Sequence, residues 1–151
     1  MKNKYAVRSV IFDSEMNTAI LSVYDGKYYK IPGGGIEEGE TEMEALHREM
    51  KEEAGCEVGV LDKIGEFSFH VEGKDRDYFS VCYVSLLKRE KGTPTFDEDE
   101  LARNYKLVWM NADKAIAMME NITAENEYEN IIHNRDLGFL KKAKEYMDKN
   151  F

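Results

Sequence analysis

Three glutamates, Glu49, Glu52 and Glu53, stand at positions i, i+3 and i+4 of a segment with helical periodicity. At about 100° per residue, their side chains share roughly one third of the helix circumference. Three carboxylates on one helix face repel one another by about a few tenths of a kcal/mol per pair in water. A cation placed between them would reverse that sign. The spacing therefore indicates either a solvated acidic face or a site for a metal ion.

The helix that carries these acids has clear start and stop signals. Thr41 is followed three residues later by Glu44, which is the spacing of a capping box, and Gly55 suits a left-handed C-terminal cap. The helix is therefore predicted to begin at Thr41 and to end before Gly55. Its other face is an apolar stripe at helical spacing: Met43, Leu46, Met50 and Ala54.

A glycine run precedes this helix, in the sequence Ile31-Pro32-Gly33-Gly34-Gly35. It lacks the Gly-Lys-Ser/Thr ending of a phosphate-binding P-loop, and no later glycine completes a dinucleotide fingerprint. By itself such a run is more typical of a tight turn, just as an acidic helix face by itself is more typical of a solvated surface.

Together, the glycine run and the acidic helix are more specific. The segment from Gly34 to Cys56 resembles the signature of the Nudix hydrolases, whose charged and glycine positions are filled here by Gly34, Glu40, Arg48, Glu49, Glu52, Glu53 and Gly55. The one departure is Cys56, where the family usually has a bulky aliphatic residue, and cysteine also behaves as a small hydrophobe. The resemblance implies an α/β fold (α+β) of the Nudix type, an α/β/α sandwich in which helices flank a mixed β-sheet.

The resemblance also implies roles for individual residues. Glu49, Glu52 and Glu53 match positions that hold a divalent metal, Mg²⁺ or Mn²⁺, and the carbonyl of Gly34 or Gly35 is expected to face the same ion. Glu49 or Glu53 is the expected general base. Two further positions support the site: Arg48 orients a neighbouring glutamate, and Glu40 supports the loop and the arginine.

A second group of acids lies in the run Asp97-Glu98-Asp99-Glu100, within a polar segment from Lys88 to Arg103 that is predicted to be a loop. Glu98 or Glu100 is a candidate for an additional metal ligand or for the base. The alternative is a solvated loop. A calcium loop is disfavoured, because the run lacks the glycine and the terminal glutamate at the spacing that such a loop needs.

Four residues are candidates for substrate binding. Arg8 is unusual in an apolar strand and points either toward bound phosphate or to the solvated face. Tyr29 and Tyr78 could stack on a base, although aromatic residues in strands more often belong to the core. His70 ends a predicted strand beside a charged turn and could contact the substrate.

Composition limits the partners. The 151 residues, 42% hydrophobic and 34% charged, indicate a single globular domain over residues 1–151. The net charge of −9 argues against nucleic acid or an anionic membrane as a partner, because both demand a basic surface. Two cysteines, no signal peptide and no long apolar run favour a cytoplasmic protein. The expected partner is a small nucleotide-type molecule, and the protein is expected to be a monomer or a homodimer.

Strands and helices alternate without a strict βαβα rhythm, which favours a mixed sheet. Strands are predicted over residues 5–12, 19–24, 27–31, 57–70, 78–87 and 105–110. A short helix is predicted to end near Met119, and a C-terminal helix is predicted over about 124–150.

The resemblance implies a divalent-metal-dependent hydrolase that cleaves a pyrophosphate bond in a nucleoside diphosphate linked to another moiety. Sequence motifs that mark several branches of the family are missing, which favours a nucleoside triphosphate or a modified one. Two alternatives stay open: a catalytically silent nucleotide-binding module of the same fold, and a pyrophosphatase for nucleotide sugars or dinucleotides.

Overall fold

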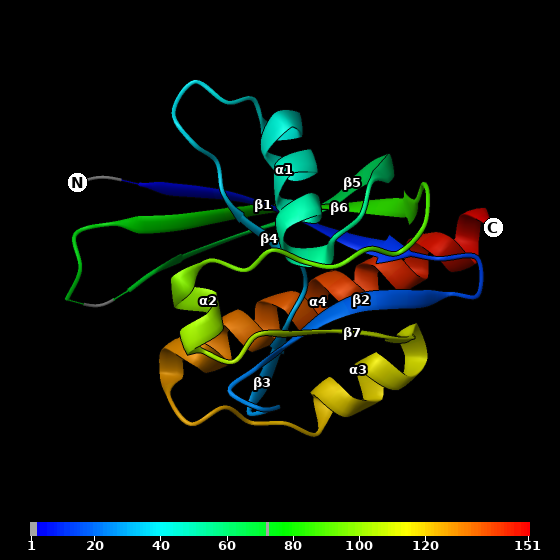
Figure 1. Cartoon of the computed structure of the whole chain (residues 1–151). Helices are drawn as coiled ribbons and strands as arrows, with labels where there is room; N and C mark the ends of the chain where they lie inside the picture. The colour runs from blue at the N-terminus through cyan, green and yellow to red at the C-terminus, as the bar shows by residue number, and fades with distance from the viewer. Residues whose placement is uncertain (1–2, 72) are drawn as a thin grey trace.

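A computed structural model describes residues 3–71 and 73–151, so the first two residues of the predicted domain and residue 72 lie outside the described part (Figure 1). The strands are β1 (Lys4–Phe12), β2 (Asn17–Val23), β3 (Tyr28–Lys30), β4 (Gly33–Gly35), β5 (Val58–His70), β6 (Asp77–Leu87) and β7 (Lys106–Asn111). The helices are α1 (Glu42–Ala54), α2 (Glu98–Ala102), α3 (Ala112–Glu120) and α4 (Glu127–Asn150).

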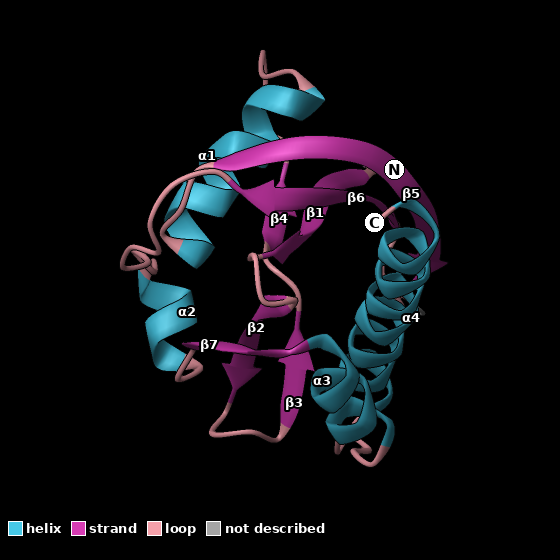
Figure 2. Cartoon of the chain, turned by 90° about the vertical axis from the view of Figure 1, so that its right-hand side faces the viewer, coloured by secondary structure: helices cyan, strands magenta, loops and turns pink. Residues whose placement is uncertain are grey.

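The strands form one mixed sheet, as predicted. Its main order is β3-β2-β1-β6-β5, while β4 pairs with β1 and β7 pairs with β2. The β1–β6 pair is parallel along the whole of β1, and the other pairs are antiparallel. Among the described residues, β1 and β2 are in register only at Phe12 and Thr18, so the sheet separates toward the start of β1. The two halves of the sheet are visible in Figure 2.

Helices cover both faces of the sheet, which confirms the expected α/β/α arrangement. Alternate side chains of β1 point to opposite faces: Val7 and Ile11 pack with α1, whereas Val10 and Phe12 pack with α3 and α4. In Figure 2, α1 and α2 lie on one side of the strands and α3 and α4 on the other. Helices α1 and α4 therefore approach the sheet from opposite faces.

Helix α1 forms where its caps predict. The side chain of Thr41 accepts from the amide of Glu44, and the Glu44 side chain accepts from the amide of Thr41. Gly55 adopts the left-handed conformation with φ 62°. The predicted apolar stripe is confirmed, because Leu46, Met50 and Ala54 are fully buried and Met43 packs against the same cluster.

Two local predictions were wrong. The segment with the acid run is not all loop: Asp97 caps the short helix α2 through a capping box with Glu100. The glycine run is not a tight turn either, since Gly33–Gly35 pairs with β1 as the strand β4. The Asp97–Glu100 spacing is itself a capping-box signal, whereas the pairing of Gly33–Gly35 depends on backbone hydrogen bonds to β1 that glycines do not reveal in a sequence.

The remaining elements lie within a few residues of their predicted ranges. The predicted strand over 57–70 is one long strand with irregularities between Val60 and Asp62 and between Lys63 and Gly65. The C-terminal segment forms the single helix α4, capped by Asn126. In the described part of the chain, no helix is both long and apolar enough to cross a bilayer.

The conformation and close packing of Gly55 at the end of α1 can be tested by substitution. A Cβ on Gly55 would lie 2.5 to 2.7 Å from backbone atoms of Thr93, at a positive φ. Gly138, inside α4, has open space around the same atom. We expect Gly55→Ala to destabilise the protein by about 1–3 kcal/mol and Gly138→Ala to stabilise it by about 0.5–1 kcal/mol. Denaturant unfolding of both variants measures this, and equal effects of the two substitutions would contradict it.

Candidate active site

A cleft of about 970 Å³ opens where the two halves of the sheet separate. One wall is the acidic face of α1 with the loop after β4, and the other is formed by the start of α4 with its neighbouring strands. The lining residues include Arg8, Lys30, Gly35, Arg48, Glu49, Glu52, Phe69, Tyr78, Ser80, Asp97, Tyr128 and Arg135. The cleft thus combines carboxylates, cations and aromatic rings within one hollow.

Arg48 connects helix α1 to the glycine run and to the loop that follows β4. Its guanidinium donates to both carboxylate oxygens of Glu40, at 2.7 and 2.9 Å, and to the carbonyl of Gly35 at 2.9 Å. It also donates to Glu49 at 2.8 Å and to Glu52 at 3.3 Å. The hydrogen bonds from Arg48 lower the pKa of Glu40 to about 2. Arg48 and Glu40 therefore lie where the expected supporting roles require.

Glu49 is packed against the glycine run. Its side chain is buried, and a Cβ on Gly34 would lie 2.6 Å from its Oε1. Burial raises the pKa of Glu49, while the hydrogen bond from Arg48 opposes that shift. Gly34 is thus required because the carboxylate occupies the space that a side chain would fill.

Glu53 is the most buried of the three helix acids, with 2% of its surface exposed. Its Oε1 accepts from the amide of Gly33 at 2.9 Å. Burial raises the pKa of Glu53 well above its usual value, and a side-chain hydrogen bond with Glu100 raises it further. Glu53 and Glu100 thus lie against each other as a pair of acids.

The other acids are more exposed. Glu52 is exposed beside Arg48, and its backbone carbonyl accepts from the amide of Thr95, which ties the segment leading to α2 to α1. This places Glu100 against Glu53. Glu98 is exposed, and it is not among the residues that line the cleft. Of the two expected additional acids, the structure therefore brings only Glu100 to the site.

The donor chemistry of this group fits a hard divalent cation. Within residues 3–71 and 73–151, no three His, Cys, Asp or Glu side chains already surround one point. The charges of Glu52 and Glu100 nevertheless raise the pKa of the buried Glu49 carboxyl, and Glu100 also raises the pKa of Glu53. Carboxylate oxygens are the ligands that Mg²⁺ prefers, and a cation would remove this repulsion.

The structure separates the four expected substrate residues into two groups. Arg8 and Tyr78 line the cleft, and the Tyr78 ring stacks on Phe69 with 5.1 Å between centroids. Tyr29 instead packs against the core beside α3 and α4, and its amide donates to His133. His70 is exposed and pairs with Asp77 at 2.7 Å. Tyr29 and His70 therefore lie outside the cleft, which corrects their expected positions.

Sequence reasoning missed Lys30 and Arg135, which also line the cleft, and Asp136 beside them. One signal was present in the sequence. Arg135 and Asp136 interrupt the otherwise apolar stripe of the C-terminal helix, in which Ile132 and Phe139 are buried. Charges within a buried stripe are rare unless they are paired or functional.

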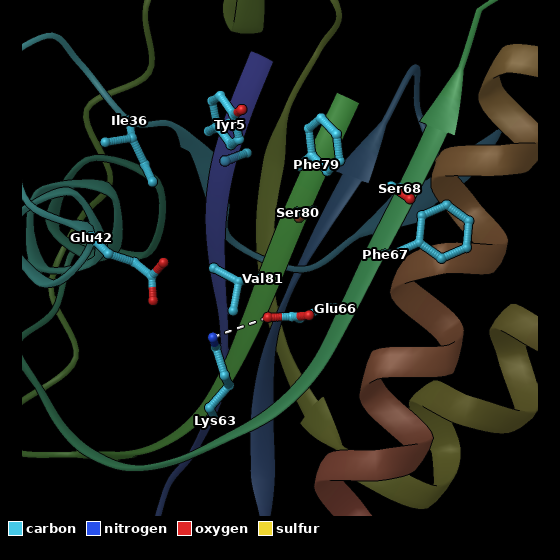
Figure 3. A pocket seen from close by; sticks show the side chains of 11 residues that line it. Tyr5, Ile36, Glu42, Lys63, Glu66, Phe67, Ser68, Phe79, Ser80 and Val81 are labelled. Carbon is cyan, nitrogen blue, oxygen red and sulfur yellow. Dashed lines mark hydrogen bonds and ion pairs between the residues drawn. The ribbon is translucent and has the colours of Figure 1, made fainter. Parts of the chain in front are cut away.

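A second hollow, of about 540 Å³, lies on the α1 face of the sheet (Figure 3). It is lined by Tyr5, Phe79 and Val81 and by an ion pair between Lys63 and Glu66 at 3.1 Å. Figure 3 shows Glu42 pointing into it from the start of α1. None of the acids around Arg48 reaches this hollow, so the larger cleft is the candidate for chemistry.

Comparison with known proteins agrees with this assignment. Residues 2–134 match the family model described as the NUDIX domain. The chain is 29% identical over 108 residues to a putative 8-oxo-dGTP diphosphatase of Bacillus subtilis, covering 64% of this chain and 67% of the relative. It is 30% identical over 112 residues to diphosphoinositol polyphosphate phosphohydrolase 3-alpha of Homo sapiens, covering 72% of this chain and 65% of the relative. The chain thus spans about two thirds of the length of these curated relatives.

The fold also matches solved structures. A NUDIX hydrolase from Nitrosomonas europaea superposes with a TM-score of 0.66 at 16% identity, covering 98% of this chain and 90% of the other. At that identity the likeness shows the fold alone.

The contact between Gly34 and Glu49 gives one prediction. In Gly34→Ala the new Cβ would meet the Glu49 carboxyl at 2.6 Å, so the carboxylate must move. We expect the loss of about 1–3 kcal/mol of stability and of most of the metal-dependent stabilisation. Gly59→Ala, where the Cβ has open space, is the matched control. Thermal unfolding with and without Mg²⁺ measures both, and an unchanged response of Gly34→Ala would contradict it.

The raised pKa of the buried Glu53 carboxyl predicts how the stability of the protein changes with pH. Because its pKa is raised from 4.5 in the folded protein, the native state binds more protons than the unfolded state above that pH. The free energy of unfolding therefore falls as pH rises through this interval. In chelator, we expect Glu53→Gln to be more stable than the wild type, by an amount that grows between about pH 5 and about pH 8.

Glu52→Gln is the control for this pH series, since Glu52 is exposed and its removal should change stability by about 0.5 kcal/mol or less. A Glu53→Gln variant that is less stable than the wild type at the upper end of the series would refute the assignment of a raised pKa.

Proposed function

The chain belongs to the Nudix family of pyrophosphohydrolases, and from that premise we propose that it uses the acids of α1 and Glu100 to hydrolyse a pyrophosphate bond in a nucleotide-type substrate. The observation that carries the proposal is the buried carboxyl of Glu53, which lies against Glu100 and shares the site with Glu49. Burying several acids together is costly in a purely structural role. It is useful if a cation and a proton transfer depend on them.

The proposed ligands for Mg²⁺ or Mn²⁺ are Glu49, Glu52, Glu53 and Glu100, with the carbonyl of Gly34. When bound, a divalent ion would neutralise phosphate oxygens and acidify the attacking water. Glu98 is left out of the proposed set because it is exposed, whereas Glu100 is partly buried and contacts Glu53.

The side chains of the protein supply the general base and the positioning contacts. Glu53 is the proposed general base, because burial and its contact with Glu100 raise its pKa and so give it a higher affinity for a proton than an exposed glutamate has. Glu49 is the second candidate, but Arg48 holds it by a hydrogen bond of 2.8 Å and favours its ionised form. Arg48 and Glu40 position Glu49 and the glycine loop without contacting the reacting atoms.

For the substrate, we propose a nucleoside triphosphate or a modified one. The names of the two relatives, a diphosphatase for an oxidised nucleotide and a phosphohydrolase for diphosphoinositol polyphosphates, support cleavage of a phosphoanhydride. The stacked rings of Phe69 and Tyr78 at the cleft offer a flat apolar surface to a base. A small molecule of this kind is the proposed partner of the site.

The test is a substrate panel with Mg²⁺. Nucleoside triphosphates, nucleotide sugars, dinucleotides and diphosphoinositol polyphosphates are incubated with the protein, and release of phosphate or pyrophosphate is measured. We expect turnover of at least one of them and a loss of about 10²–10⁴-fold in kcat for Glu53→Gln. Glu57→Gln, an exposed acid that pairs with Arg89 just beyond α1, should keep wild-type activity.

Two results would overturn the proposal. Absence of turnover across the whole panel would favour a binding module of the same fold. Turnover that Glu53→Gln leaves unchanged would remove Glu53 from the chemistry.

A further inference from the structure

Three cations gather on the wall of the cleft opposite the acids of α1. Arg8 comes from β1, Lys30 from β3 and Arg135 from α4, and all three line the cleft. Arg8 is 6% exposed and Arg135 is 5% exposed, while Lys30 is partly buried. The chain has a net charge of −9, so a cluster of cations stands out from its composition. Burying like charges together is also unfavourable, because they repel one another.

One carboxylate holds this group in place but does not neutralise it. Asp136 is fully buried and accepts from Arg135 Nε at 2.7 Å and from the amide of Ile31 at 3.0 Å, with Arg8 Nε 3.9 Å away. Lys30 donates instead to the phenol of Tyr105 at 2.9 Å. The repulsion is visible in Lys30, where burial and then the charge of Arg8 lower the pKa to about 8. Asp136 is thus the carboxylate beside Arg8 and Arg135, while the charge of Glu53 also acts on Lys30.

The same wall holds polar atoms without partners. In the described part of the chain, Nε of Arg8, Nη2 of Arg135 and Oγ of Ser80 are buried and make no hydrogen bond. All three residues line the cleft. A buried donor left without a partner costs about 1–3 kcal/mol, so three donors in one place indicate a site that a ligand completes.

The backbone is shaped around this group as well. A Cβ on Gly33 would lie 2.4 Å from Cγ of Arg8, so the absence of a side chain there makes room for the Arg8 stem. Gly33 also donates its amide to Glu53, which places the acid pair and the cations on either side of one glycine. The two groups of charge therefore share a cleft and face it from opposite layers of the fold.

We propose that Arg8, Lys30, Arg135 and Ser80 form a second anion site in the cleft, which binds a phosphate group carried by the moiety beyond the scissile pyrophosphate. Guanidinium groups bind phosphate through paired hydrogen bonds, and lysine adds a point charge. The charges of Lys30 and Glu53 interact, whereas Arg135 belongs to α4, on the face of the sheet opposite α1. A phosphate that Arg135 holds is therefore expected to be one other than the scissile phosphates. The substrate class is therefore a pyrophosphate linked to a further phosphate, a class that includes a nucleoside triphosphate with its third phosphate.

The position of that phosphate relative to the scissile bond rests on the proposed function, whereas the existence of the anion site does not. Asp136 is the positioning residue, because it fixes Arg135 and the start of the glycine run without reaching the ligand itself.

The first experiment measures binding without turnover. Inositol hexakisphosphate, a polyphosphate with no pyrophosphate bond, is titrated into the protein in chelator by calorimetry at fixed salt. We expect Lys30→Met to raise the dissociation constant about 10- to 100-fold, the effect of losing one charge-assisted contact. Arg8→Met is the second variant, in case one substitution alters folding. Lys27→Met removes a charge from the adjacent turn, where Lys27 is exposed and pairs with Glu125, and should bind as the wild type does.

The second experiment compares substrates that differ by one phosphate: coenzyme A with 3′-dephospho-coenzyme A, and NADP with NAD. We expect kcat/KM to favour the phosphorylated member by about tenfold or more and Lys30→Met to abolish that preference.

The outcomes separate the two proposals. Equal binding of inositol hexakisphosphate by the wild type, Lys30→Met and Arg8→Met would overturn the anion site. Hydrolysis without any preference within the pairs would overturn the phosphorylated second moiety. Failure of every substrate, with the binding difference intact, would overturn only the proposed hydrolysis.

Discussion

The contact that the rest of the site depends on is the set of hydrogen bonds from Arg48. This side chain joins Glu40 and the carbonyl of Gly35 on the loop to Glu49 and Glu52 on the helix. Without the positive charge of Arg48, the carboxylates of α1 would repel one another and the carboxylate of Glu40. Because Arg48 is only partly exposed, solvent screens these contacts less than those of a surface pair. The loop and the helix are thus held in one geometry by electrostatics as well as by packing.

Close packing of backbone against carboxylate is the second constraint. Gly33 and Gly34 lie where side chains would collide with Arg8 and Glu49, and strand β4 fixes both glycines to β1. The chain therefore brings a cation and a carboxylate within reach of one short strand. Placing opposite charges on the two sides of a glycine strand suits a substrate that is anionic along its length, with a metal needed only on the acidic side.

The separation of the sheet explains why the site lies where it does. β1 and β2 are in register only at their shared end, and the earlier part of β1, from Ala6 to Arg8, pairs with the short strand β4 instead. Arg8 lies on the α4 side of β1, and the alternation of the strand places Val7 under α1. The separation of β1 from β2 thus opens a cleft with an acidic wall and a cationic wall.

The sequence by itself determined the local features of this protein. The capping box at Thr41, the stop at Gly55 and the spacing of Glu49, Glu52 and Glu53 depend on neighbours within about one or two turns, so helix α1 and its acidic face could be predicted. Tertiary structure decided which acids are buried, that Glu100 rather than Glu98 meets Glu53, and that Tyr29 and His70 lie away from the cleft. It also brought together Arg8, Lys30 and Arg135 from three elements distant in sequence. Such contacts depend on the packing of the sheet between its helices, and no local spacing encodes them.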